Sequence, residues 1–382
     1  MHICLVYDCV YPLTIGGAER WYRALAEALV ADGHEVTYLT RRQWPKGQDA
    51  GLPGVRVVAV SPESELYDAA GRRRTLPPLA FGAGVLAHLL RHGRRYDVVH
   101  TASFPYFSLL AAAAARRRGR YRLVVDHHEV WTRDYWLSYA GTVTGGIGWL
   151  VQKACLRVRQ TAIAFSGLTA RRCASEGLRD PVTVVGGLYT GDLEAHEVRE
   201  ADPVVLYAGR HIPEKQVPAV VPAVARAHEA LPELRGRILG DGPDRALVER
   251  LVDEGGLRDV VAVEGFVDRA RLDRELAHAL VLLLPSRREG YGIVVVEAAS
   301  YGTPSIVVAG EDNAAAELVR DGVNGVVAPS ASPEDLAAAI LRVHELGPAL
   351  RDSTSAWFEA EADALSMRRS IARVPELYAA AA

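Results

Sequence analysis

The chain has 382 residues, more than one hydrophobic core usually holds, and this length predicts two domains. Hydrophobic residues make up 49% of it and charged residues 24%, which excludes a disordered chain. The formal net charge is −3, and none of the four cysteines forms a Cys-x-x-Cys pair that would support zinc or redox chemistry.

The charge is unevenly divided between the two halves. Residues 1–195 hold 24 Arg and Lys against 17 Asp and Glu, and residues 196–382 hold 20 against 30. A basic half favours an anionic partner such as a membrane surface or a phosphorylated acceptor, although solvated arginine-rich helices give the same count. Nucleic acid is not expected as a partner.

The sequence indicates a cytoplasmic protein. No secretory signal peptide precedes the first predicted strand. The longest apolar run, near Leu79–Leu90, is too short to span a bilayer. A peripheral contact with the inner membrane face, through the basic N-terminal half, stays open.

The first half alternates short strands with helices. Its strands are continuously apolar, as in a parallel sheet covered on both faces. The predicted strands are His2–Tyr7, Glu35–Leu39, Val55–Val60, Asp97–His100, Leu123–Val125, Ala162–Phe165 and Val182–Val185. The predicted helices are Ala18–Ala31, one within Leu79–Arg91, Ser108–Arg117 and Gly145–Arg159.

The pattern restarts after a polar segment, Tyr189–Asp202, which we interpret as a linker. The predicted strands of the second half are Val204–Tyr207, Gly236–Leu239, Val260–Val263, Val281–Leu284 and Ser305–Val308. The predicted helices are Val217–Ala230, Asp244–Glu254, Ile293–Tyr301, Pro333–Glu345 and Ala356–Tyr378. The repeat predicts an α/β protein of two Rossmann-like parallel-sheet domains that face each other across a cleft, with ligands beyond the C-terminal strand ends.

A Gly-Gly turn follows the first predicted strand. Gly16 and Gly17 let backbone N–H groups approach a ligand closely, and the helix that opens here favours anions. The turn is not Gly-x-Gly-x-x-Gly, and no Gly-x-x-x-x-Gly-Lys-Ser/Thr motif occurs. A phosphate or substrate contact and a plain tight turn both fit these residues.

Two cations follow the first strand of the second half. Arg210 comes after the strand and Lys215 opens the next helix, so both are expected at the ligand-binding edge of that sheet. A planar guanidinium and a lysine ammonium suit the oxygens of a diphosphate leaving group. A surface salt bridge, for example between Lys215 and Glu214, is the alternative.

Two carboxylates flank a glycine-containing turn. Glu289 precedes Gly290-Tyr291-Gly292, and Glu297 lies within the helix that starts near Ile293. Free N–H groups at Gly292–Val294 suit a phosphate, and a carboxylate accepts both hydroxyls of a sugar or ribose diol. A helix-dipole partner and a solvated helix residue are the alternatives. A lone Glu in an apolar helix needs a partner, which favours a function for Glu297.

A histidine pair ends one strand of the first half, in Asp126-His127-His128-Glu129. Adjacent side chains of an extended segment point to opposite faces, which disfavours a metal held by both histidines. A catalytic or binding histidine and a structural one remain. The aromatic residues that follow suit either stacking on an acceptor or packing against a helix. They are Trp131, Tyr135, Trp136 and Tyr139.

In their order and spacing these residues resemble the retaining glycosyltransferases of family four, which have the GT-B fold. The resemblance covers nearly the whole chain. It rests on Gly16-Gly17, His128-Glu129, Gly209-Arg210 with Lys215, Gly240-Asp241-Gly242-Pro243, and Glu289 with Glu297.

The resemblance implies an enzyme that transfers a glycosyl unit, as a hexosyltransferase, from a nucleoside diphosphate sugar, with UDP as the default nucleotide. Arg210 and Lys215 would bind the donor diphosphate, and Glu297 would hold the ribose. Glu289 would hold the transferred sugar, and His128 would lie by the reacting sugar or the acceptor. The remaining donor-binding residues would be Gly16, Gly17, Phe266, Val267, Gly290, Tyr291, Gly292 and Ile293.

The same resemblance implies three parts of the chain. Residues 1–190 would form an acceptor-binding domain, and residues 203–365 a domain that binds the nucleotide sugar. The terminal helix, 366–382, would cross back to the first domain.

No metal or other cofactor is expected. Asp-x-Asp does not occur in the sequence, so the usual metal–diphosphate bridge of the other transferase architecture is missing. The two cations and a helix N-terminus would stabilise the leaving group instead. One departure from the family is Ala309-Gly310-Glu311-Asp312-Asn313-Ala314, where Gly-Gly-x-x-Glu is usual. That loop often faces the donor, so the donor sugar stays open.

Other functions are compatible with parts of the pattern. A nucleotide-sugar 2-epimerase has a similar two-domain shape, and a non-catalytic sensor of sugar nucleotides would keep the binding residues. A sensor has less need of leaving-group cations, and a dehydrogenase is disfavoured by the missing Gly-x-Gly-x-x-Gly. The acceptor stays open between a small molecule, a glycan and a lipid-linked molecule.

Overall fold

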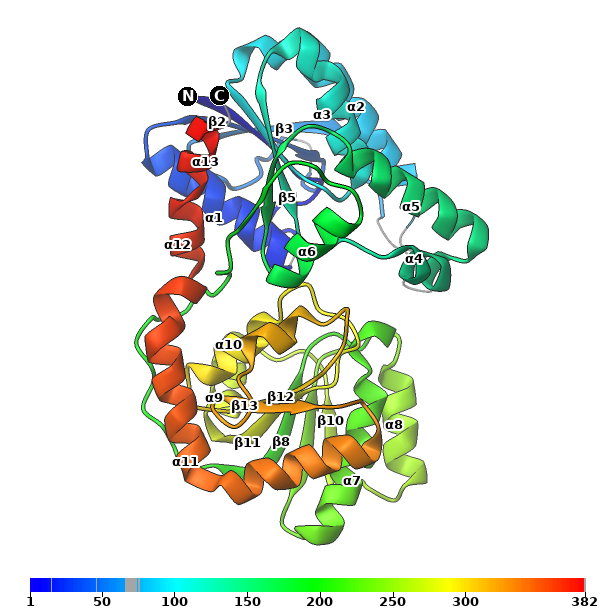
Figure 1. Cartoon of the computed structure of the whole chain (residues 1–382), viewed down its shortest axis with the longest axis vertical. Helices are drawn as coiled ribbons and strands as arrows, with labels where there is room; N and C mark the ends of the chain where they lie inside the picture. Colours follow the sequence, from blue (N-terminus) through cyan, green and yellow to red (C-terminus); the bar gives the residue numbers. More distant parts are fainter. Residues whose placement is uncertain (15, 46, 66–73, 75, 381–382) are drawn as a thin grey trace. The chain divides into compact units, whose positions relative to one another are not determined.

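The computed structural model describes residues 1–14, 16–45, 47–65, 74 and 76–380. The chain divides into two compact units (Figure 1). Unit 1 comprises Met1–Leu188 and the segment from Met367 onward, and unit 2 comprises Tyr189–Ser366. In the described residues, no helix is long and apolar enough to cross a bilayer.

Unit 1 is built on a sheet of seven parallel strands in the order β3-β2-β1-β4-β5-β6-β7. Its strands are β1 His2–Val6, β2 Glu35–Arg41, β3 Val55–Ser61, β4 Val98–Ala102, β5 Arg122–His127, β6 Thr161–Ala164 and β7 Val182–Val184. The strand order reverses between β1 and β4, which is where open parallel sheets bind ligands. The predicted strands of the first half are therefore confirmed as one parallel sheet.

Helices cover both faces of this sheet (Figure 1). They are α1 Gly17–Ala31, α2 Leu76–His92, α3 Tyr106–Gly119, α4 Arg133–Ala140, α5 Thr142–Leu156, α6 Gly167–Ser175, α12 Met367–Ala372 and α13 Val374–Ala380, with a short 3-10 turn η1 at Gly93–Arg95. Ile3 and Leu5 on one face of β1 and Cys4 and Val6 on the other are all fully buried, because helices lie over both faces.

The end of the chain belongs to the core of unit 1. Met367, Val374 and Tyr378 pack in the same buried cluster as Trp21 and Leu25 of α1. The sequence predicts one helix over Ala356–Tyr378, whereas the structure has separate short helices after Ser366. The last part of the predicted crossing helix, residues 381–382, lies outside the described residues.

Unit 2 is built on six parallel strands in the order β10-β9-β8-β11-β12-β13. The strands are β8 Asp202–Ala208, β9 Arg235–Leu239, β10 Val261–Glu264, β11 Ala279–Leu284, β12 Ser305–Val308 and β13 Gly325–Ala328. The order reverses between β8 and β11. The loops after these two strands are therefore the expected ligand-binding loops.

The helices of unit 2 alternate with its strands. They are α7 Val220–Ala230, α8 Arg245–Glu254, α9 Arg269–His278, α10 Ile293–Ala299 and α11 Pro333–Leu365, with 3-10 turns η2 Pro213–Lys215, η3 Val217–Ala219 and η4 Ala314–Leu318. α11 bends at Gly347, whose φ of 59° and ψ of −148° are not helical, and Pro348 follows.

Candidate active site

The loop after β11 meets the turn after β8 at the switch point of unit 2. The backbone N–H of Arg287 donates to the carbonyl of Glu214 at 3.0 Å. This contact brings the Ser286–Gly292 loop beside the η2 turn, although about 70 residues separate them in the chain. Lys215 and Glu289, which the sequence predicts as parts of one site, therefore lie side by side.

Glu289 is the centre of this arrangement. Its Oε1 accepts hydrogen bonds from the Nζ of Lys215 and, at 2.8 Å, from the Oγ of Ser286. The carboxylate is buried, and both partners come from the ends of adjacent strands. Lys215 thus pairs with Glu289.

The loop that departs from the family pattern supports Glu289 from the other side. The N–H of Glu289 donates to the carbonyl of Asp312 at 3.0 Å, and the N–H of Ala314 donates back to the carbonyl of Glu289 at 3.0 Å. The buried amide of Asn313 donates to the carbonyls of Ser286 and Val308 at 3.1 and 2.9 Å. Asn313 therefore ties the Glu289 loop to the end of β12.

Arg210 lies at the same sheet edge and is exposed. Its carbonyl accepts from the Oη of Tyr207 at 2.9 Å, and burial raises the pKa of Tyr207, which stays protonated as the donor. Two glycines let another loop approach this backbone closely. A Cβ on Gly240 would lie 1.9 Å from the carbonyl oxygen of Gly209, and one on Gly242 would lie 2.4 Å from that of His211. The Gly-x-Gly-Pro turn thus fixes the backbone that carries Arg210.

Glu297 lies on α10 and is buried. Its Oε1 accepts from the Nη1 of Arg269, whose Nε pairs with Asp273 at 2.8 Å. The sequence predicted that this Glu needs a partner but did not identify Arg269. The side chain of Asp268 caps α9 by accepting from the N–H of Arg271 at 2.7 Å, and this capping residue was the signal for a helix beginning here.

The turn between Glu289 and Glu297 requires glycine at position 292. Gly292 has φ of 93°, and a Cβ there would lie 2.5 Å from the Cβ of Ala315. Tyr291 is buried, and Gly290 and Ile293 are partly buried around it. The predicted base-flanking pair follows β10 on the other side of the sheet, where Phe266 is 72% exposed and Val267 packs against the core.

In unit 1 the Gly-Gly turn lies after β1, at the switch point of that sheet. Gly17 begins α1, and a Cβ there would meet no other atom within 4 Å. A Cβ on Gly16 would lie 2.2 Å from a carboxylate oxygen of Glu19. The carboxylate of Glu19 therefore lies over the turn at the start of this helix.

His128 follows β5 in unit 1. Its ring stacks on Phe165, with centroids 4.6 Å apart and an angle of 2° between the planes. Burial lowers the pKa of His128, and the nearby carboxylates of Asp126 and Glu129 partly offset that effect. A neutral imidazole is therefore favoured, and a neutral ring can accept a hydrogen bond from a hydroxyl.

The residue that precedes the two histidines has a structural role that the sequence did not reveal. Asp126 is fully buried and pairs with the Nε2 of His100 at 2.8 Å and the Nε1 of Trp21 at 2.8 Å. The Nδ1 of His100 bonds the Oη of Tyr378 at 2.7 Å. This chain of contacts joins α1, β4, β5 and α13. It therefore fixes the end of β5, which His128 follows.

His127 is buried on the opposite side of the strand from His128. Its Nε2 bonds the Oε1 of Gln160 at 3.0 Å, and burial lowers its pKa to about 4. Among the described residues, no group of three or more His, Cys, Asp or Glu side chains is placed to hold a metal ion.

Two family models match the chain. The model described as Glycosyltransferase Family 4 matches residues 15–187, and the model described as Glycosyl transferases group 1 matches residues 189–356. The alpha-D-kanosaminyltransferase of Streptomyces kanamyceticus is 34% identical over 150 residues, 39% of this chain. That match spans only 38% of the length of the kanosaminyltransferase.

Solved structures share the fold along the whole chain. Sucrose-phosphate synthase of Thermosynechococcus elongatus superposes with a TM-score of 0.79 at 21% identity, covering 99% of this chain and 98% of that one. HepE of Anabaena, solved in complex with UDP, superposes with a TM-score of 0.72 at 19% identity and complete coverage of both chains. With the two family matches, which lie end to end along the chain, these likenesses show that the protein belongs to the family-four type of glycosyltransferases and has the GT-B fold.

Proposed function

We propose that this protein transfers a glycosyl unit from a nucleoside diphosphate sugar to an acceptor hydroxyl, with retention of configuration and without a metal ion. The observation that carries the proposal is the group at the switch point of unit 2. One cation, Lys215, is paired with the buried carboxylate of Glu289, and a second, Arg210, is exposed beside it. Family membership gives the reaction type, and these residues give its chemistry.

The two cations serve the leaving group. When the bond between the sugar and the β-phosphate breaks, the electron pair stays on the phosphate oxygen and the negative charge there rises. Arg210 and Lys215 would stabilise that charge, as fixed donors do at other sites of developing charge. A diphosphate that draws Lys215 toward itself would free Glu289 to accept hydroxyls of the transferred sugar.

The nucleoside would lie on the other part of unit 2. Glu297 would accept the two ribose hydroxyls, and the exposed ring of Phe266 would lie against the base. UDP is the favoured nucleotide, a preference supported by the UDP-bound HepE structure, whose fold this chain shares. The donor sugar is not assigned.

The acceptor would bind to unit 1. His128 offers a neutral imidazole, and Trp131, Tyr135 and Tyr139 form a cluster with centroids 4.8 to 6.1 Å apart after it. Aromatic faces suit the apolar faces of sugar rings or an apolar acceptor. The oxygen of the acceptor hydroxyl would bond to the sugar from the side of the leaving group, as retention requires, and its proton would pass to the phosphate oxygen that leaves.

A nucleotide screen tests the donor proposal. We expect UDP to raise the melting temperature more than GDP, ADP or dTDP, because a ligand that binds only the folded state stabilises it. UDP-sugars would then be incubated without acceptor. Slow hydrolysis supports a transferase, epimerised donor supports the epimerase alternative, and binding without turnover supports a sensor. No shift with any nucleotide would contradict the donor site.

A further inference from the structure

One helix of unit 1 carries apolar residues on its outer face. Val143, Ile147 and Leu150 of α5 are 74%, 59% and 61% exposed, and Tyr139 at the end of α4 is 49% exposed. Spacings of four and three residues place Val143, Ile147 and Leu150 on one side of the helix. Single exposed apolar residues are ordinary, but a continuous row marks a surface that binds something. We name these three residues of α5 the apolar stripe.

The inner face of α5 is fully occupied, so the apolar stripe cannot turn inward. A Cβ on Gly145 would lie 2.2 Å from the carbonyl oxygen of Trp136, and one on Gly148 would lie 2.4 Å from the Trp136 ring. The buried side chain of Gln152 accepts from the N–H of Trp131 at 3.0 Å and from the Nε1 of Trp136 at 3.2 Å. These contacts fix the rotation of α5 about its axis.

The segment that contains the apolar stripe is rich in cations, of which Lys153 on α5 pairs with Glu176 of the following segment. From Tyr135 to Ser175 the sequence contains five Lys and Arg and no Asp or Glu. Arg157 is exposed and lies seven residues after Leu150, so it continues the face of the apolar stripe just beyond the end of α5. A row of aliphatic residues that ends in a cation is typical of helices that lie on anionic membranes.

A group of arginines adjoins this end of α5. The arginine cluster consists of Arg94, Arg95, Arg116, Arg117, Arg118 and Arg120. The Nη1 of Arg116 donates to the carbonyl of Arg159 at 2.8 Å, which joins the cluster to the segment after α5, and the Nε of Arg94 donates to the carbonyl of Arg118 at 3.3 Å. Residues 91–122 contain eight Arg and a single acid, Asp97.

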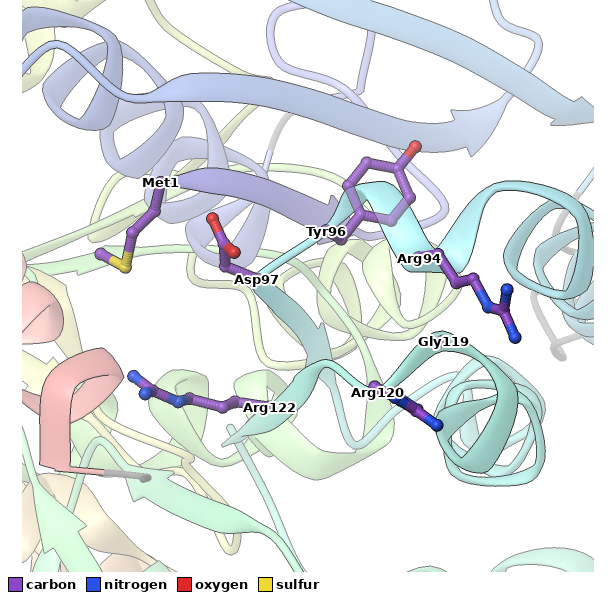
Figure 2. Close-up of a pocket in the computed structure, with 7 residues that line it drawn as sticks. All are labelled: Met1, Arg94, Tyr96, Asp97, Gly119, Arg120 and Arg122. Atoms are coloured by element: carbon purple, nitrogen blue, oxygen red, sulfur yellow. The ribbon is translucent and has the colours of Figure 1, made fainter.

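A pocket of about 940 Å³ opens at the edge of the arginine cluster (Figure 2). Arg94, Arg120 and Arg122 line it, and its one acid, Asp97, already accepts the N–H of His2 at 2.7 Å. Within the described part of the chain, Arg94, Arg117 and Arg120 form no ion pair with a carboxylate. These guanidinium groups are therefore available to phosphate groups of a partner.

We propose that the apolar stripe and the arginine cluster form one surface that docks unit 1 on an anionic lipid bilayer. The apolar stripe would enter the boundary between head groups and acyl chains, and the arginines would contact lipid phosphates. Each cation near an anionic surface strengthens the electrostatic attraction between protein and membrane, and salt weakens this attraction by screening the charges. A second copy of the chain fits less well, because a symmetric contact would bring arginine clusters together.

Vesicle sedimentation of the full chain tests the proposal. We expect the protein to sediment with vesicles of phosphatidylcholine and phosphatidylglycerol, and not with phosphatidylcholine alone, with binding that falls as salt rises. Ile147→Glu combined with Leu150→Glu, and separately Arg117→Glu combined with Arg118→Glu, should each weaken binding at least tenfold. The matched controls are Leu247→Glu and Arg258→Glu in unit 2, which should bind like wild type.

Three outcomes would overturn the proposal. The first is no sedimentation of the wild type with anionic vesicles, and the second is equal binding by both pairs of variants and their controls. The third is a dimer in size-exclusion chromatography that Ile147→Glu dissociates, which would assign the apolar stripe to a second copy. Circular dichroism of each variant checks the fold. Nucleotide binding by unit 2 is measured separately, so failure of the donor proposal would not affect this result.

Discussion

A single oxygen of Glu289 accepts hydrogen bonds from both Lys215 and Ser286. In this arrangement the ammonium is held near the expected diphosphate position without being committed to it, because a doubly charged ligand would compete with one carboxylate. The buried carboxylate would retain Ser286 as a partner when Lys215 moves. In the proposed reaction the pair would therefore couple the binding of the leaving group to the release of a Glu289 oxygen for the sugar.

Lys215→Ala tests the role of that cation. We expect kcat to fall roughly 10²–10³-fold, the usual cost of removing one donor to a developing charge, while the melting temperature changes little. The matched control is Lys153→Ala, which removes another lysine paired with a glutamate, Glu176, in unit 1. Near-wild-type turnover by a well-folded Lys215→Ala protein would contradict the role of this cation.

Glu297 offers a test of the nucleoside position. Glu297→Gln keeps the size of the side chain but removes the charge that Arg269 contacts and that the ribose hydroxyls would contact in the proposed complex. We expect the Kd for UDP, measured by calorimetry, to rise roughly tenfold or more, since hydrogen bonds to a charged group are the stronger ones. Glu264→Gln is the control, because Glu264 also pairs with arginines but lies on β10. Equal loss in both variants would point to general destabilisation.

Residue types and spacing predicted which groups share a sheet edge, but not their partners. Arg210, Lys215 and Glu289 were placed together because strand ends of a parallel sheet meet at one edge. Arg269, Asn313 and the pairing of Asp126 with His100 were not identified. These depend on how helices and loops pack in three dimensions, which leaves no periodic mark in the sequence.

At the scale of elements, the long apolar strands and periodic helices were predicted well, and polar or short elements were missed. Three helices, α4, α6 and α9, were not predicted because few apolar residues interrupt their polar or aromatic sequence. In α11 the sequence predicts a gap between Glu345 and Ala356, whereas the helix bends only around Gly347. The packing of α11 against β13 and α7 overrides the local glycine and proline.

Arg351 on α11 is the buried residue that fastens this helix to the sheet of unit 2. Its guanidinium donates to the carbonyl of Ala279, the first residue of β11, at 2.7 Å and to that of Ala277, near the end of α9, at 2.8 Å. Arg351→Met should lower the free energy of unfolding by about 1–3 kcal/mol, because it leaves buried carbonyls without donors. Urea unfolding followed by circular dichroism measures the change. The control Arg342→Met removes an exposed pair with Asp321 and should cost under about 1 kcal/mol.

At the scale of the whole molecule, a repeated β–α pattern was sufficient to predict two parallel sheets. The strand orders were not readable from sequence, since a parallel strand can join either edge of a growing sheet. α12 and α13 join the core of unit 1 through Met367, Val374 and Tyr378, which are buried among residues of α1. No local sequence pattern predicts this burial. The segment that contains α12 and α13 therefore contributes to the stability of unit 1.

Acid should destabilise unit 1 through the buried ring of His127. Burial lowers the pKa of His127 from 6.5 to about 4, so the unfolded chain binds this proton more readily than the folded one. The stability that His127 contributes is complete above about pH 6.5 and is lost as the pH falls toward 4, by about 3 kcal/mol in all. Asp126 adds to the loss at lower pH: burial raises its pKa, but His100 and Trp21 more than offset this and hold the pKa below its ordinary value.

Tryptophan fluorescence measures this pH effect in unit 1 because five of the six tryptophans lie there, with only Trp357 in unit 2. Urea unfolding across this pH range should show a falling free energy of unfolding for the wild type. His127→Asn removes the titrating group and should flatten the dependence between about pH 6.5 and 4, although it lowers stability at neutral pH. An unchanged slope in His127→Asn would assign the acid sensitivity to other groups, with His128, whose pKa burial also lowers, the next to replace.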